Sequence, residues 1–232
     1  AQQPQNNPEA HNLDKELTSA GQMQRALLPK SLPNDVPLRF AATYQTSRHA
    51  GGDYYDAIQI DKDRVGLVVI DVSGHGAKAA IVMAMMRAVI HSSPCGMADP
   101  ACVLQHLNRH FEFLWDTNMF ATAIMGVLDV RSRSFRVASA GHMPPLLIRG
   151  TNVTEMPMAN APLLLWNEIA DPPIAEFTLE AGDRVVFYTD GITDRCGPHD
   201  SRFDLTRVMS SFARNSGLDL QAMLTELDRE LD

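Results

Sequence analysis

Residues 65–76 read Val-Gly-Leu-Val-Val-Ile-Asp-Val-Ser-Gly-His-Gly, an apolar run that ends in an acidic residue and a glycine turn. Its first six residues are mostly β-branched or apolar, which predicts a buried strand. Asp71 follows that strand directly, and glycines flank His75 in the turn that comes next. Because glycine permits tight turns and close backbone approach, the stretch predicts a carboxylate held at a strand end beside a turn.

Two further carboxylates have the same setting. Asp53 follows a Gly-Gly pair, and Asp190 lies between an apolar run, 184–189, and a glycine. A single Asp at such a place is more simply explained as a turn or helix cap. Three of them favour a shared site, and carboxylates that gather without cations repel, so we expect a hard divalent metal, Mg²⁺ or Mn²⁺. Asp56 could join this site through water or be exposed.

Composition sets the frame for this site. The 232 residues carry a net charge of −8, a sequence pI near 5.4 and 45% hydrophobic residues, enough for the core of one large domain or two small ones. The acidic balance argues against a nucleic-acid partner. No apolar run has the length of a membrane span, and no signal peptide is visible. Because the polar start lacks Met, we expect part of a longer cytoplasmic protein, or the cytoplasmic domain of a membrane-anchored one.

The cysteines have no recognisable pairing pattern. Cys95, Cys102 and Cys196 show neither disulfide-like nor zinc-like spacing. We therefore expect reduced thiols, as is usual in a cytoplasmic compartment.

The N-terminal part predicts a linker over 1–12 and a regulatory helix within 13–30, which prolines at 29 and 33 end. Positions spaced four and three residues apart form an a/d seam along this helix, namely Leu13, Leu17, Ala20, Gln24 and Leu27. One interpretation is an amphipathic helix that lies on its own domain. The other is the end of a signalling helix that enters from an upstream sensor domain, with a homodimer through this helix as a possible consequence.

The remainder, 31–232, alternates hairpins with blocks of helix. Strands are expected at 38–45, 57–60, 64–70, 120–130, 134–139, 144–149, 175–179 and 184–189, and helices at 77–91, 100–115, 205–213 and 218–231. Dominant hairpins and separate helices favour an α+β fold with antiparallel sheets and helices packed outside. The Pro-rich segment 151–173 is expected to be irregular, either tucked into the core, which is favoured, or a flap beside the site.

Several histidines accompany these motifs. His75 could act as a general acid near the metals or make a structural hydrogen bond. His142, in an Ala-Gly-His-Met-Pro-Pro turn, is expected to shape its loop. His106 and His110 share a helical face, but no Glu follows His106, so a solvated face is favoured over a zinc site.

The motifs together resemble one family. The stretches concerned are Ala-Gly-Gly-Asp-Tyr-Tyr-Asp (50–56), Asp-Val-Ser-Gly-His-Gly-x-x-Ala-Ala (71–80), Ala-Gly-His-Met-Pro-Pro-Leu-Leu (140–147), Gly-Asp-x-Val-Val-Phe-Tyr-Thr-Asp-Gly-Ile-Thr-Asp (182–194) and Gln-Arg-x-Leu-Leu-Pro (24–29). In this order, over most of residues 20–210, they resemble the SpoIIE branch of the metal-dependent PPM (type 2C) protein phosphatases. The resemblance implies two stacked antiparallel sheets flanked by helices, with two Mn²⁺ or Mg²⁺ ions at one end.

The resemblance also implies an activity and its residues. The activity is hydrolysis of phosphoserine or phosphothreonine on a partner protein, often a small STAS-type anti-anti-sigma regulator. Asp53 and Asp71 would hold the metal pair with the carbonyl of Val72, Asp190 would bind one ion, and His75 could protonate the leaving oxygen through water. Two ions would share and activate one water for in-line attack.

One departure from the family pattern affects the C-terminus. The family usually ends with an Asp-Asp-x-Thr strand that supplies another ligand, whereas this sequence stops at Glu230-Leu231-Asp232. We therefore expect a phosphatase domain over 31–232 that lacks this strand. A catalytically weakened interaction module of the same fold is the alternative. A metal-dependent nuclease is disfavoured by the acidic pI.

Overall fold

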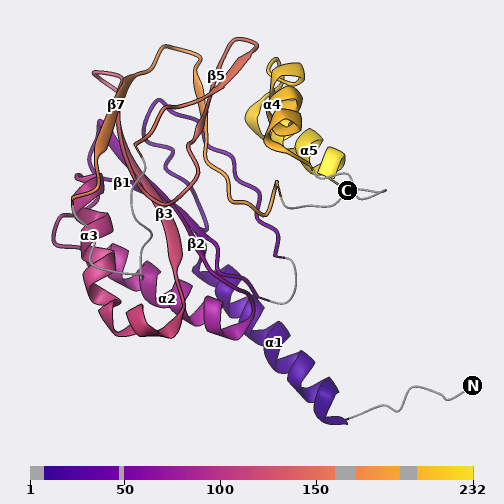
Figure 1. Cartoon of the computed structure of the whole chain (residues 1–232). Helices are drawn as coiled ribbons and strands as arrows, with labels where there is room; N and C mark the ends of the chain where they lie inside the picture. Colours follow the sequence, from indigo (N-terminus) through magenta and orange to yellow (C-terminus); the bar gives the residue numbers. More distant parts are fainter. Residues whose placement is uncertain (1–7, 47–49, 160–170, 194–202, 232) are drawn as a thin grey trace, which may run out of the picture.

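The computed structural model describes residues 8–46, 50–159, 171–193 and 203–231. These residues form two antiparallel sheets stacked between helices (Figure 1). The strands are β1 Tyr54–Gln59, β2 Arg64–Val72, β3 Ala121–Asp129, β4 Ser134–Ala140, β5 Leu146–Arg149, β6 Asn152–Glu155, β7 Ile174–Thr178 and β8 Arg184–Val186. The helices are α1 Pro8–Leu27, α2 Ala77–His91, α3 Pro100–His110, α4 Leu205–Arg214 and α5 Leu220–Leu231, with a 3₁₀ turn, η1, at Glu112–Thr117.

The two sheets differ in size. The larger has the strand order β1-β2-β3-β4-β7, and the smaller has the order β6-β5-β8. Strand β2 pairs antiparallel with β3 from Arg64 to Val72, and this register sets Asp71 opposite Thr122. The apolar alternation of β2 and β3 therefore fixes which end of the larger sheet carries Asp71, since a shift of one residue would turn every side chain to the other face.

Three buried layers hold the sandwich together. Helices α2 and α3 cover the outer face of the larger sheet, with Met83, Met86, Leu104 and Leu107 fully buried there. Ile124, Phe135 and Val137 lie between the sheets, packed against Leu147 and Val185 of the smaller one. Helices α4 and α5 cover the far side of the smaller sheet, where Leu146, Ile148, Phe212 and Leu227 are buried. The order is helix, sheet, sheet, helix, which confirms the predicted α+β sandwich.

Two expectations about strands are wrong. Residues 38–45 form no strand, because Leu38 and Phe40 pack against the edge of the larger sheet near Ala57 and Val65 instead of joining a ladder. Within the segment expected to be irregular, β6 pairs with β5 from Asn152 to Glu155. Whether the remainder of that segment packs into the core or forms a flap is not addressed, because residues 160–170 lie outside the described residues.

The first helix begins earlier than expected. It starts at Pro8, so residues 8–12 of the predicted linker are helical, and it ends at Leu27 as the prolines predicted. In Figure 1 its C-terminal end lies beside α2, and its N-terminal end projects beyond the sandwich.

The expectation of free thiols is also wrong for one pair. Cys95 and Cys102 form a disulfide, with their Cα atoms 6.3 Å apart. The turn between α2 and α3 brings the two cysteines within the range that a disulfide spans, which spacing in the sequence could not show. Cys196 lies outside the described residues.

No helix in the described part of the chain is long and apolar enough to cross a membrane. The division into a regulatory helix and a phosphatase domain, the cytoplasmic location and the missing terminal strand stay predictions.

Candidate active site

The three carboxylates singled out in the sequence meet at one end of the sandwich. Asp71, next to last in β2, shares side-chain hydrogen bonds with both Asp53 and Asp190. Asp53 lies in the loop before β1, and Asp190 lies in the turn after β8, so both sheets contribute. Thr189 Oγ1 also donates a hydrogen bond to Asp53 Oδ2 at 2.8 Å, which links the two contributions directly.

This proximity changes the acidity of the central carboxyl. Burial, and then the charges of Asp53 and Asp190, raise the pKa of Asp71 from 3.8 to about 8. A hydrogen bond between two carboxyl groups needs a proton on one of them, so Asp71 keeps its proton at neutral pH when no cation is near. A divalent cation would take the place of that proton and allow all three groups to ionise.

A glycine brings the Val72 carbonyl to the same place. A Cβ on Gly52 would lie 2.2 Å from Val72 O, so only glycine lets the Asp53 loop pass this close. The turn that follows β2 is tied to the same loop, since the Gly76 N–H donates to Ala50 O at 3.0 Å. Gly76 has φ of 77°, a conformation that favours glycine. Gly52 and Gly76 are thus needed for close backbone approach and for a tight turn, as the sequence predicted.

The donor set fits a hard cation in its chemistry, although its arrangement in the described residues does not surround one. No group of three or more His, Cys, Asp or Glu side chains in the described ranges has an arrangement that would hold an ion as it stands. The carboxyls are instead joined by hydrogen bonds to Asp71. Three carboxylates with a backbone carbonyl offer only oxygen ligands, which is the set that Mg²⁺ and Mn²⁺ prefer.

Helix α1 supports the Asp53 loop through a residue whose role sequence reasoning missed. Gln24 is buried, its Nε2 donates to Gly51 O at 2.6 Å, and its Oε1 accepts from Gly51 N at 3.0 Å. Tyr44 adds a second support, because its hydroxyl accepts from Gln24 and donates to Asp53 O at 3.2 Å. Burial, then the charge of Asp53, raises the pKa of Tyr44 to about 12. The sequence did contain one indication of this role, since Gln24 is a polar residue within the otherwise apolar a/d seam of the first helix.

Two other expected residues are placed differently. His75 is exposed and has no hydrogen-bond partner among the described residues. Asp56 is neither exposed nor part of the cluster: it is 8% exposed, accepts from the Tyr54 hydroxyl at 2.6 Å and contacts His91 Nε2 at 3.0 Å. It belongs to a buried polar group between β1 and α2, because the alternation along β1 turns Tyr54 and Asp56 to the same face.

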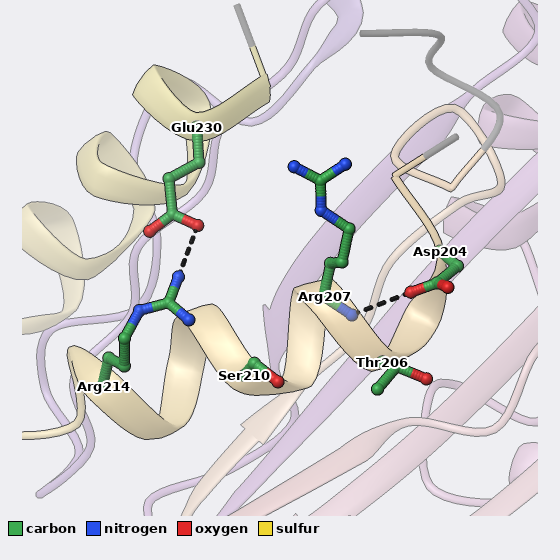
Figure 2. Close-up of a pocket in the computed structure, with 6 residues that line it drawn as sticks. All are labelled: Asp204, Thr206, Arg207, Ser210, Arg214 and Glu230. Atoms are coloured by element: carbon green, nitrogen blue, oxygen red, sulfur yellow. Dashed lines mark hydrogen bonds and ion pairs between the residues drawn. The ribbon is translucent and has the colours of Figure 1, made fainter. Parts of the chain in front are cut away.

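A separate pocket of about 460 Å³ lies on the outer helices (Figure 2). Its lining comes from α4 with its N-cap and from α5, namely Asp204, Thr206, Arg207, Ser210, Arg214 and Glu230. Arg214 pairs with Glu230 at 2.7 Å, and Asp204 accepts from the Arg207 N–H at 2.9 Å to cap the helix. None of the three clustered carboxylates lines this pocket, so the candidate site is the strand-end cluster.

The fold and the cluster define a class and then a family. Two stacked sheets between helices, with carboxylates at one strand end, are the architecture of PPM (type 2C) phosphatases. The chain belongs to the SpoIIE family, whose description, "Stage II sporulation protein E (SpoIIE)", matches residues 61–232.

Relatives and solved structures agree with this family. The phosphoserine phosphatase RsbU of Bacillus subtilis is 30% identical over 183 residues, which cover 78% of this chain and 54% of RsbU. The chain therefore spans about half the length of this relative. The SiaA-PP2C domain of Pseudomonas aeruginosa has the same fold, with a TM-score of 0.84, 21% identity, and coverage of 98% of this chain and 91% of that domain. The RsbU and RsbW domains of Rv1364c from Mycobacterium tuberculosis match with a TM-score of 0.65 and 28% identity, over 81% of this chain and 51% of that one.

Proposed function

We propose that this chain is a metal-dependent protein serine/threonine phosphatase domain. The observation that carries the proposal is the set of hydrogen bonds that joins Asp71 to Asp53 and Asp190 from opposite sheets. Phosphate chemistry by a carboxylate cluster needs divalent cations, and the oxygen-only donor set suits two Mn²⁺ or Mg²⁺ ions. The name of the relative RsbU, a phosphoserine phosphatase, supports the same activity.

Each residue of the cluster has a role in this proposal. Asp53, Asp71 and the Val72 carbonyl would hold the ions, and Asp190 would bind one of them. When bound, such ions lower the pKa of a shared water and neutralise phosphate charge. Thr189 orients Asp53 through its hydrogen bond, and exposed His75 is the candidate that returns a proton to the leaving Ser or Thr oxygen.

The substrate that we propose is a phosphorylated STAS-type regulator in a bacterial partner-switching pathway. The structure of Rv1364c, which joins an RsbU domain to an RsbW domain, supports a place in such signalling. The alternative is an interaction module of the same fold that binds the phosphoprotein without releasing phosphate.

The test is release of phosphate from a phosphoserine-bearing STAS-type protein at increasing Mn²⁺. We expect the release of phosphate from this protein to depend on Mn²⁺. DNA or a phosphodiester should not serve as a substrate in its place, and Asp71→Asn should abolish the activity. Binding of the phosphoprotein without phosphate release at any Mn²⁺ concentration would support the interaction module instead.

We also propose that α1 transmits regulation from an upstream domain, alone or through a homodimer. Two observations support this: its N-terminal end projects from the sandwich in Figure 1, and Gln24 near its C-terminal end grips the Asp53 loop. The test compares association and Mn²⁺-dependent turnover of the longer natural protein with and without a charge at Leu27. No change in either quantity would contradict this role.

A further inference from the structure

His142 lies where the chain crosses from one sheet to the other. It follows β4 of the larger sheet and precedes β5 of the smaller sheet, and its side chain is buried. Its backbone is fixed on both sides: Ser139 Oγ accepts from His142 N at 3.1 Å and donates to His142 O at 3.0 Å. Gly141, with φ of 69°, makes the turn before it and bridges to Ala123 of β3. The imidazole therefore has little freedom to move.

The two ring nitrogens reach two different strand ends. Nδ1 lies 2.8 Å from Thr122 Oγ1, and Nε2 lies 3.0 Å from Tyr188 O. Thr122 is the register partner of Asp71 in the β2–β3 ladder. Tyr188 comes two residues before Asp190, and its ring is buried with the helices of the far layer. One side chain thus connects the neighbour of Asp71 to the backbone that leads to Asp190.

The chemistry of the partners fixes the proton on this imidazole. A carbonyl can only accept, so Nε2 must carry the hydrogen that is shared with Tyr188 O. Burial lowers the pKa of His142 to about 4, so the ring is neutral near pH 7 and Nδ1 accepts from the Thr122 hydroxyl. A neutral ring with both nitrogens used is suited to holding geometry and is not placed to exchange protons with a substrate.

We propose that His142 is a positioning residue that sets the separation between Asp71 and Asp190 through its bonds to Thr122 and Tyr188, and so tunes divalent-cation binding. The inference rests on the proposed function, since it assumes that the carboxylate cluster binds Mn²⁺ or Mg²⁺. The smaller sheet contributes Asp190 from a turn beyond the three-residue strand β8, so a bond at Tyr188 acts close to the end of regular pairing. Partners that orient metal ligands indirectly typically alter metal affinity by about 10–100-fold when removed.

Two substitutions of His142 test its hydrogen bonds to Thr122 and to Tyr188 separately. In His142→Gln the amide can reach the Nε2 position and still donate to Tyr188 O, whereas the shorter side chain of His142→Asn reaches only toward Thr122. Titrating Mn²⁺ alone into the 232-residue chain by calorimetry, we expect His142→Asn to raise the dissociation constant about tenfold. His142→Gln should stay within about threefold of the wild type. Thr122→Val keeps the Tyr188 bond but leaves the buried Nδ1 without its donor, so it should lie between them.

The control is Ser211→Ala, which removes a fully buried hydroxyl, bonded to Glu230, on the outer helix α4. It should lower thermal stability without changing the Mn²⁺ dissociation constant. With substrate present, excess Mn²⁺ should restore most turnover to His142→Asn, because the loss lies in cation binding. A merely structural role would give no such recovery.

The outcomes distinguish this inference from the proposed function. If Asp71→Asn abolishes Mn²⁺ binding but His142→Asn binds Mn²⁺ like Ser211→Ala, the positioning role is wrong and the metal site stands. If Asp71→Asn leaves Mn²⁺ binding unchanged, the proposed function itself fails. If His142→Asn does not fold, the comparison of Thr122→Val with Ser211→Ala decides: equal Mn²⁺ affinities would overturn the positioning role.

Discussion

The larger and smaller sheets support their carboxylates in different ways. Asp71 lies inside β2, which is paired on both sides, with β1 and with β3. Asp190 lies in a turn four residues beyond the end of β8, which is three residues long and pairs only with β5 among the described strands. The larger sheet thus places its ligand by backbone pairing, and the smaller sheet depends on side-chain bonds near the site. Substitutions near the site in the larger sheet and in the smaller sheet should therefore have different effects on activity and metal binding.

The largest effect is expected from the larger sheet. Asp71→Asn should reduce Mn²⁺-dependent phosphate release about a hundredfold or more, because metal stabilisation of transition-state charge is worth several kcal/mol and about 1.4 kcal/mol is tenfold in rate. The metal-free variant should be as stable as the wild type or more so, since the folded wild type must keep Asp71 protonated at a pH where the unfolded chain ionises it, and Asn removes that cost. Phosphate-release assays and thermal unfolding in EDTA measure both. Turnover near that of the wild type would contradict the assignment of Asp71.

The second-largest effect is expected from the hydrogen bond between Thr189 and Asp53, which joins the two sheets at the site. Thr189→Val removes the hydroxyl that donates to Asp53, and a bond to a charged acceptor is worth about 1.5–3 kcal/mol. We expect the Mn²⁺ concentration for half-maximal turnover to rise about tenfold. The matched control is Thr225→Val on α5, whose hydroxyl donates within its own helix, to Gln221 O. Equal behaviour of the two variants would mean that the Thr189 bond does not tune the site.

The buried imidazole of His142 should make the stability of the fold depend on pH. Its pKa is lowered from 6.5 to about 4, so the unfolded chain binds a proton at His142 that the folded chain refuses. Stability from this group is present above about pH 6.5 and is lost as pH falls through about 4. In EDTA, protonation of Asp71 shifts stability in the opposite direction over that window, so the comparison with His142→Gln isolates the effect of the imidazole. Between about pH 6.5 and pH 4, the thermal midpoint of the wild type should fall by about 5–10 °C relative to that of His142→Gln. Parallel pH profiles for the two proteins would show that His142 is not the cause.

The support that α1 gives to the Asp53 loop should appear mainly as stability. Gln24→Ala leaves the Gly51 N–H and C=O without their partner, which should lower the free energy of unfolding by about 1–3 kcal/mol. Gln22→Ala, an exposed glutamine on the same helix, should change it little. Urea unfolding of both variants makes the comparison. A Gln24 variant as stable as the Gln22 variant would show that the helix does not hold this loop.

The smallest effect on the site is expected from the disulfide. Closing a loop of seven residues is worth about 2 kcal/mol, so Cys95→Ser with Cys102→Ser should lower the thermal midpoint. The Mn²⁺ dissociation constant should not change. The bridge follows the far end of α2, whose 15 residues span about 22 Å from the turn beside Asp71. A change in Mn²⁺ affinity would show that α2 transmits strain to the cluster.

The sequence predicted the regular parts of this molecule well because their signals are local. Helix α2 was expected and found at Ala77–His91, after a glycine turn, and the β1–β2 and β3–β4 hairpins came from alternation and turn residues. It failed where apolar residues serve packing without pairing. Leu38 and Phe40 read as a strand but fill the space beside β1, which depends on a surface assembled from distant segments.

The family, the sandwich and the three carboxylates could be predicted from the sequence, because motif spacing, apolar periodicity and glycine turns are properties of short stretches of chain. The contacts that hold those carboxylates in place became visible only in the folded chain. Gln24 meets Gly51, Thr189 meets Asp53, and His142 joins Thr122 to Tyr188, contacts that link positions from 20 to 136 residues apart. Such contacts arise when the packed sheets bring strand ends together, and a polar residue carries no local mark of the distant partner that it will meet.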